Sequence, residues 1–263
     1  MSKRMFITAL ALVVISISVW QADVSEADVV FDGLISYWTF DEADMDGNTV
    51  MDIVGSNNGT IMGNPEIVDG WIGEALQFDG ASGSVDCGND QSLNIGEEDF
   101  TLDIWFNGGT QTSDWPCLFR KGNALCDTCP PGYAIYWAGN MWIFALDGSD
   151  QAGDQIKVSA SSAPYMDETW HHIAGTRDKS DVKLYLDGAL AASGASTSRD
   201  VSVSTSLVLS FDTIFNGAID EAKIYNRALS EDEIRSNYEA TSRELAVEPA
   251  SKLAIKWGGI KSE

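Results

Sequence analysis

The chain has 263 residues, a formal net charge of −24 at pH 7 and a pI near 4.1. This acidic balance argues against nucleic acid and anionic membrane surfaces as partners, because both require a basic face on the protein. Nine Trp and ten Phe supply enough large apolar side chains to fill one substantial core.

The first 27 residues differ in kind from the rest. A basic start precedes the apolar run Met5–Val19, which is too short to cross a bilayer comfortably as a helix. Ser25 and Ala27 then offer a small-x-small cleavage site, so we predict a secretory signal peptide that is cut after Ala27, with Ala22 as the other candidate cleavage position. An uncleaved N-terminal anchor is the alternative. We expect the mature protein to be secreted and to act outside the cell or at its surface.

Seven short segments carry the clearest patterns. Six are alternating or glycine-punctuated runs of the kind that form strands and their turns. In chain order these six are Gly33–Glu42 (GLISYWTFDE), Asp52–Thr60 (DIVGSNNGT), Gly70–Gly80 (GWIGEALQFDG), Phe100–Trp105 (FTLDIW), Trp170–Thr176 (WHHIAGT) and Leu184–Gly188 (LYLDG).

The seventh segment, Phe215–Ile234, combines a strand with a helix start. Its run Ala218–Tyr225 has a period of two, so we expect even-numbered and odd-numbered residues on opposite faces of a sheet. The run then breaks, and Ser230 stands three residues before Glu233, which is the spacing of a capping box. We therefore predict a late strand followed by one short helix.

Taken in this order, the seven segments resemble LamG-like jellyroll domains, which belong to the concanavalin A-like lectin/glucanase superfamily. The resemblance covers about residues 33–238 and implies an all-β fold, a two-sheet antiparallel jellyroll sandwich with one short C-terminal helix. The expected organisation is a signal peptide at 1–27, a LamG-like jellyroll domain at 28–240 and a C-terminal tail at 241–263. The tail is slightly basic, and we expect it to be flexible, with a docking or cell-surface retention segment as the alternative.

The resemblance also implies one structural Ca²⁺ where the first and last strands meet. It places Asp41, the turn of Asp79 and Gly80, and Asp220 near that ion, with Glu42 as a substitute ligand. Carboxylate and carbonyl oxygens are the ligands that Ca²⁺ prefers. The alternative is that these are ordinary turn and edge acids, each solvated separately.

The chain has four cysteines, Cys87, Cys117, Cys126 and Cys129. An even number of cysteines in an exported protein predicts disulfides, here two that would fix the loop 121–132 to its neighbours. Four cysteines allow three pairings, and the sequence does not choose among them. The Cys126-x-x-Cys129 pair also fits half of a zinc knuckle, but the other two cysteines supply no second half.

Motifs for catalysis are missing from the sequence. Retaining glucanases of this superfamily carry a Glu-x-Asp-x-x-Glu run, and this chain has none. Its only histidines, His171 and His172, are adjacent and therefore expected on opposite faces, one packed and the other exposed, and no Gly-x-Ser-x-Gly elbow accompanies them. We predict a module that is not an enzyme; a glycoside-active enzyme is the weaker alternative.

Binding is the better prediction, to carbohydrate or, as the alternative, to another protein in a structural or adhesive role. Sugar sites combine an aromatic surface with carboxylates and amides nearby. One stretch of the chain gathers such side chains. The candidate ligand-binding residues are Trp115, Asp127, Tyr136, Trp137, Asn140 and Trp142.

Overall fold

The computed structural model describes residues 28–111, 115–122, 131–147, 155–197, 199–210 and 215–241. The predicted signal peptide and all of the predicted tail except Thr241 lie outside these residues, so both stay predictions. In the part of the chain that is described, no helix is long and apolar enough to cross a membrane.

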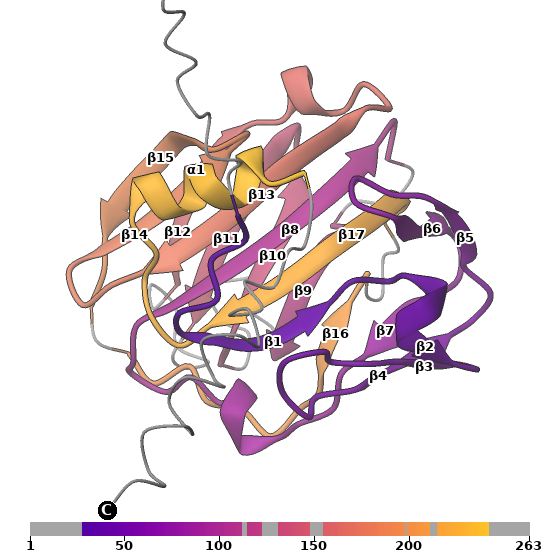
Figure 1. Ribbon diagram of the computed structural model, residues 1–263. Helices are drawn as coiled ribbons and strands as arrows, with labels where there is room; N and C mark the ends of the chain where they lie inside the picture. The colour runs from indigo at the N-terminus through magenta and orange to yellow at the C-terminus, as the bar shows by residue number, and fades with distance from the viewer. Residues whose placement is uncertain are drawn as a thin grey trace, which may run out of the picture.

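The described residues form two antiparallel sheets packed face to face (Figure 1). The eight-stranded sheet contains, in spatial order, β15 (Ala189–Ala195), β14 (Asp181–Leu186), β13 (Trp170–Arg177), β8 (Phe100–Gly108), β17 (Asn216–Tyr225), β6 (Glu74–Asp79) and β5 (Glu66–Asp69), with β1 (Leu34–Trp38) also paired to β17. The nine-stranded sheet contains β12 (Ile156–Ser161), β11 (Met141–Asp147), β10 (Gly132–Ala138), β9 (Cys117–Gly122), β16 (Leu207–Leu209), β7 (Ser84–Asp86), β4 (Gly59–Met62), β3 (Thr49–Val50) and β2 (Met45–Asp46). One α-helix, α1 (Glu231–Glu239), and three short 3₁₀ turns at Glu42–Asp44, Gln91–Leu93 and Ala163–Tyr165 complete this part of the chain. The predicted two-sheet sandwich is confirmed.

The core lies between the two sheets and follows from the period of two along the strands. In β8, alternate side chains enter the core, whereas Asp103 and Trp105 face away from it. The four core residues of β8 are Phe100, Leu102, Ile104 and Phe106. A smaller apolar cluster, which includes Tyr37, Tyr185 and Ile234, lies on the outer face of the eight-stranded sheet.

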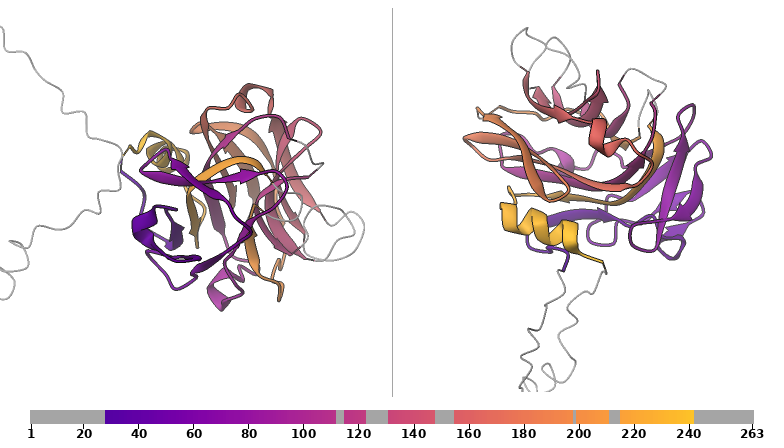
Figure 2. Two further views of the ribbon diagram at one scale, coloured as in Figure 1. Left: turned by 90° about the vertical axis from the view of Figure 1, so that its right-hand side faces the viewer. Right: turned by 90° about the horizontal axis from the view of Figure 1, so that it is seen from above.

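Helix α1 covers part of that outer face, as Figure 2 shows from above. Tyr238 of the helix stacks on Trp105, with ring centroids 5.5 Å apart. The helix also holds the start of the domain, because Asn237 Oδ1 accepts a hydrogen bond from the Val30 N–H (2.9 Å) and Ser236 Oγ donates one to the Asp28 carbonyl (2.8 Å). The first and last described segments are thus joined by direct hydrogen bonds.

The simple alternation expected for Ala218–Tyr225 is wrong at its centre. Ile219 and Ala222 both belong to the core, and the two residues between them, Asp220 and Glu221, both make contacts outside it. A β-bulge explains the difference: the register with β8 shifts here, and Glu221 has a positive φ of 56°. A bulge inserts one extra residue, so two consecutive side chains can share a face.

The predicted capping box is confirmed. Ser230 Oγ accepts a hydrogen bond from the Glu233 N–H (3.3 Å), and the Glu233 carboxylate accepts one from the Ser230 N–H (2.8 Å). Arg227 then binds the same carboxylate through two nitrogens, at 2.9 and 2.7 Å, which fixes the turn between β17 and the helix.

Replacing Ser230 by Ala removes the side-chain acceptor at the start of α1. We expect Ser230→Ala to lower the free energy of unfolding by about 1 kcal/mol, because one helical N–H loses its partner. Urea unfolding measures this change. Ser82→Ala, at an exposed serine whose hydroxyl makes no hydrogen bond within the described residues, is the matched control and should unfold as the wild type does. Equal losses for the two variants would contradict the role given to the cap.

Candidate functional site

Two adjoining hollows at one rim of the sandwich share Gly109 and Thr110 as a common wall, and we call them together the rim groove. Their volumes are about 340 and 270 Å³. The first hollow lies at the edge of the eight-stranded sheet where β6 and β8 end and β17 begins. The second hollow reaches the β10–β11 turn of the other sheet. The lining residues are Gln77, Asn107, Gly109, Thr110, Gln111, Trp137, Asn140, Ser162, Ala163, Met166, Glu168, Asn216 and Gly217.

Trp137 provides the aromatic surface of the groove. It is the last residue but one of β10 and packs partly against the core, and its Nε1 donates a hydrogen bond to Ser162 Oγ (2.8 Å). The Ser162 N–H in turn donates to the carbonyl of Asn140 (3.0 Å), which lies in the tight β10–β11 turn with a φ of 65°. The indole ring is therefore held in a fixed orientation before any ligand arrives.

Amide side chains fix the central wall of the groove. Gln111 and Asn216 exchange two hydrogen bonds: the Asn216 N–H donates to Gln111 Oε1, and Gln111 Nε2 donates to the Asn216 carbonyl, both at 2.9 Å. Asn216 Nδ2 also donates to the Thr110 carbonyl (3.1 Å). These bonds join the chain after β8 to the start of β17 and hold the shape of the wall.

Three polar side chains that line the groove make no hydrogen bond or ion pair within the described residues: Asn107, Asn140 and Glu168. Asn107 and Gln77 both lie opposite Ala218 in the sheet, so they share its outer face. Glu168 is placed by its backbone, whose N–H donates to the Gly108 carbonyl (3.1 Å). These groups are available to a ligand.

The loop that carries Glu168 is tied down by a histidine. His171 Nδ1 lies 2.9 Å from Asp187 Oδ2, and its Nε2 lies 3.1 Å from Asp167 Oδ1. The Asp167 carboxylate also accepts hydrogen bonds from the backbone N–H and hydroxyl of Thr169, at 3.0 and 2.6 Å. Because Asp167 is held by these bonds, the backbone position of the next residue, Glu168, is restricted.

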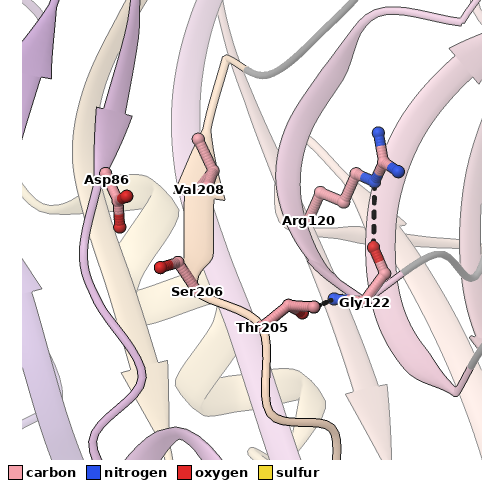
Figure 3. Close-up of a pocket in the computed structure, with 6 residues that line it drawn as sticks. All are labelled: Asp86, Arg120, Gly122, Thr205, Ser206 and Val208. Carbon is pink, nitrogen blue, oxygen red and sulfur yellow. Dashed lines mark hydrogen bonds between the residues drawn. The ribbon is translucent and has the colours of Figure 1, made fainter.

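A second pocket of about 270 Å³ opens on the outer face of the nine-stranded sheet (Figure 3). Val208 lies in it between Asp86 of β7 and Arg120 of β9. Arg120 Nε donates to the Gly122 carbonyl (2.9 Å), and the Gly122 N–H donates to Thr205 Oγ1 (2.9 Å). No aromatic ring is among the described residues that line this pocket, whereas Trp137 lines the rim groove.

The densest set of titratable groups lies elsewhere, under α1, and is fully buried. Asp103 accepts hydrogen bonds from His172 Nε2 and Asn237 Nδ2, both at 3.0 Å, and its other oxygen lies 3.5 Å from Lys223 Nζ. Glu221 lies 3.6 Å from the same ammonium and also binds the Tyr37 hydroxyl. All of these side chains are buried, so the network contributes to the stability of the fold.

The sequence model of the concanavalin A-like lectin/glucanases superfamily matches residues 79–235, more than half of the chain. The chain belongs to this superfamily. No curated protein matches the sequence.

Solved structures of toxin binding domains share the superfamily fold with this chain. The binding domain of Paraclostridial Mosquitocidal Protein 1 aligns with a TM-score of 0.62 and 19% identity, over 79% of this chain and 52% of that one. The binding domain of botulinum neurotoxin DC in complex with rat synaptotagmin II gives 0.63 and 16%, over 80% and 52%. The same neurotoxin domain in complex with SialylT gives 0.62 and 15%, over 80% and 52%. The chain thus spans about half the length of these structures, and at such identities the likeness shows the fold alone.

The structure divides the predicted ligand-binding residues among separate places. Trp137 and Asn140 line the rim groove. Trp142 is fully buried in the core, while Trp115 and Tyr136 stack on each other, centroids 5.9 Å apart, where Tyr136 belongs to a small cluster on the outer face of the nine-stranded sheet. The last candidate, Asp127, lies outside the described residues. Neighbouring residues of β10 point to opposite faces of the sheet, so Tyr136 and Trp137 lie at different sites although they are adjacent in the sequence.

Glu168, Asn107 and Gln77 were missed by sequence analysis. Asn107 and Gln77 continue the outward positions of β8 and β6, so a strict count of alternation would have marked them as exposed polar residues. Glu168 carries no such signal, because it lies in a loop and its own backbone has a left-handed φ of 64°.

The four predicted calcium ligands are not brought together. Asp41 Oδ1 accepts the Glu74 N–H (2.7 Å), and Asp220 Oδ2 accepts the Ile72 N–H (3.0 Å), so both carboxylates cap the turn before β6. Asp79 and Gly80 lie at the far end of β6, where Asp79 accepts hydrogen bonds from its own turn at 2.8 Å, which lower its pKa. A six-residue strand separates the two ends by roughly 17 Å.

Glu42, the substitute ligand, donates its backbone N–H to Glu74 and so lies at the near end of β6. Among the described residues, no group of three or more His, Cys, Asp or Glu side chains is placed to hold a metal ion. The set of residues given by the resemblance therefore does not fit one ion, and calcium binding itself stays a prediction.

Cys87 is a buried free thiol, which corrects the expectation that it forms a disulfide. It belongs to the core between the sheets, whereas Cys117 belongs to the cluster on the outer face of the nine-stranded sheet, so the sheet separates the two sulfur atoms. Burial raises the pKa of the Cys87 thiol. Cys126 and Cys129 lie outside the described residues.

Of the two histidines, His172 is fully buried and hydrogen-bonded, as expected for one of the pair. His171 is not the exposed partner that we expected: its side chain is only 13% exposed, because Tyr165 and Phe106 pack against it.

Asp103 gives the fold a defined response to acid. Burial by itself raises the pKa of this carboxyl, but the charges of His172 and Lys223 and the hydrogen bonds from His172 and Asn237 outweigh burial and lower the pKa to about 2. A folded-state pKa below the ordinary value of 3.8 means that its stabilisation, about 2 kcal/mol, is complete above pH 4 and is lost as the pH falls towards 2.

We expect Asp103→Asn to lower the free energy of unfolding at pH 7 by about 3 kcal/mol, because Lys223 and His172 lose a buried counter-charge. The variant should also lose less stability than the wild type between pH 4 and pH 2. Urea unfolding across this range measures both effects. Asp46→Asn, at an exposed carboxylate of β2, is the control, and parallel pH profiles for Asp103→Asn and the wild type would contradict the assignment.

The calcium prediction has a direct test. If one ion binds the native state only, saturating Ca²⁺ should raise the melting temperature by several degrees over protein in EDTA, since ligand binding stabilises in proportion to RT ln(1 + [L]/Kd). Calorimetry on the full chain measures this shift. Equal melting temperatures in calcium and in EDTA would contradict the prediction that the native state binds Ca²⁺.

Proposed function

We propose that the chain is a secreted, non-catalytic module that binds carbohydrate in the rim groove. The observation that carries the proposal is the composition of this groove: the fixed indole ring of Trp137, together with the amides of Asn107 and Asn140 and the carboxyl group of Glu168, which make no hydrogen bond within the described residues. A sugar ring offers an apolar C–H face and a border of hydroxyl groups. Side chains that stack and side chains that both accept and donate hydrogen bonds match these two features.

Preorganisation supports the proposal. The ring of Trp137 is oriented by Ser162, and the central wall by the reciprocal bonds of Gln111 and Asn216. A site whose side chains are already ordered spends less free energy on ordering them when the ligand binds. Concave, largely preformed sites with a few placed polar groups are the usual form of small-ligand sites.

The similar structures support a binding role outside the cell. Their titles name binding domains, one in complex with SialylT and another with rat synaptotagmin II, and one title states that cell entry of botulinum neurotoxin type C depends on two ganglioside molecules. These statements concern those toxins. For this chain they favour a binding domain over an enzyme.

A protein-binding role is the second candidate. Several large apolar side chains are exposed close together in sequence: Met51, Ile53 and Val54 are between 39 and 42% exposed. Exposed apolar groups of this kind are typical of protein contacts when they form a continuous patch. A carbohydrate in the rim groove would not explain why Met51, Ile53 and Val54 are exposed.

Trp137→Ala tests the proposed carbohydrate site. Loss of the stacking surface should weaken binding to any sugar that the wild type holds by about 2 kcal/mol, or roughly thirtyfold. A glycan array finds the sugars, and calorimetric titration measures the affinities. Trp115→Ala is the matched control, because Trp115 is an exposed tryptophan outside the groove.

Asn140→Gly is a second variant that spares the fold. Glycine accepts the positive φ of this turn residue, so only the amide is lost. Melting temperatures show whether each variant is folded. Full affinity in both Trp137→Ala and Asn140→Gly, or no binding of the wild type to any sugar while it melts cooperatively, would contradict the proposal and favour a protein ligand.

A further inference from the structure

We infer that the rim groove selects neutral oligosaccharides and rejects sugars that carry a carboxylate or sulfate group, and that Glu168 sets this selectivity. The inference rests on the proposed function, because it names the class of ligand for the same groove. It comes from the charges in and around the groove.

Among the described residues that line the groove, Glu168 is the one ionisable side chain. No Lys, Arg or His is among these lining residues, and within the described chain no cation pairs with the Glu168 carboxylate. An anionic group that entered the groove would find no counter-charge among these residues, and it would approach the Glu168 carboxyl group.

The surroundings have the same sign. Asp79 is the cross-strand neighbour of the groove residue Asn216, and the hydrogen bonds from its own turn lower its pKa, so it stays ionised. Asp167 precedes Glu168 directly. His171, three residues after Glu168, is already held between two carboxylates, Asp167 and Asp187. The net charge of −24 adds a repulsive field over the whole molecule.

Sugar hydroxyl groups suit this lining. An ionised carboxylate accepts hydrogen bonds only, and bonds from hydroxyl donors to it are among the stronger ones in proteins. The amides of Asn107 and Asn140 each donate and accept, so they can bind hydroxyl groups in either direction. A neutral sugar therefore satisfies all three side chains, whereas a carboxylate or sulfate placed near Glu168 leaves two like charges together.

The inference also separates this chain from the similar botulinum neurotoxin DC domain, which was solved in complex with SialylT. A shared fold does not transfer the ligand, because specificity lies in the side chains of the site and not in the sandwich that carries them.

The test compares pairs of ligands. Each neutral oligosaccharide that binds on the array is titrated into the full-length protein beside the same oligosaccharide with one terminal sialic acid or one sulfate group. The anionic partner should bind at least about tenfold more weakly at low ionic strength, since its charge would lie near the Glu168 carboxyl group without a counter-charge. Added salt should narrow this ratio, because salt screens exposed charges.

Glu168→Gln keeps the size of the side chain and removes its charge. We expect this variant to bind neutral sugars about threefold to tenfold more weakly, because a charge-assisted hydrogen bond is lost, and to discriminate less between neutral and anionic partners. Asp232→Asn, which removes one exposed carboxylate from α1, is the control for net charge and should leave the ratio unchanged.

The outcomes are distinguishable. Equal or tighter binding of the anionic partner to the wild type, or a ratio that Glu168→Gln does not change, would overturn the selectivity while leaving a carbohydrate-binding groove. Failure of the wild type to bind any sugar would overturn the proposed function itself, and the selectivity with it.

Discussion

A single buried carboxylate, that of Asp103, holds together the layer that covers the eight-stranded sheet. Removing such a charge from water is costly unless it is paired and hydrogen-bonded. Its partners come from three separate elements: His172 from β13, Lys223 from β17 and Asn237 from α1. Because Asn237 also binds the Val30 backbone, the same contact ties the first described segment of the chain to the helix that follows the last strand.

The covering layer determines where a ligand has access. Helix α1 covers the part of the outer face that holds Trp105 and the buried charges: Tyr238 of the helix stacks on Trp105, and Trp71 also stacks on Trp105, at 3.9 Å. The rim at the ends of β6 and β8 lies beyond this cover. Glu168 and Asn140 at the rim are exposed to solvent, whereas the charged residues beneath the helix are buried.

The bulge in β17 connects these two regions. By placing Asp220 and Glu221 outside the core together, it gives one carboxylate to the turn before β6, through the Ile72 N–H, and the other to Tyr37 and Lys223. The eight-stranded sheet therefore carries the buried network around Asp103 in one region and the rim groove in another. The superfamily fold is compatible with many ligands, and the choice among them is made by side chains at such rims.

The sequence by itself determined the all-β class, the order of the strand segments and the capped helix, because each depends on residues near one another in the chain: a period of two, or a serine three residues before a glutamate. The sequence also predicted Trp137 and Asn140 as ligand-binding residues, because an aromatic ring and an amide stand beside a turn. Only the tertiary structure decided that Trp142 is core, that Cys87 lies on the other side of a sheet from Cys117, and that Asp41 and Asp79 stand at opposite ends of β6. It also brought Glu168 beside Asn107. These relations depend on a bulge, on strand pairing between distant segments and on a left-handed loop residue, none of which leaves a local pattern in the sequence.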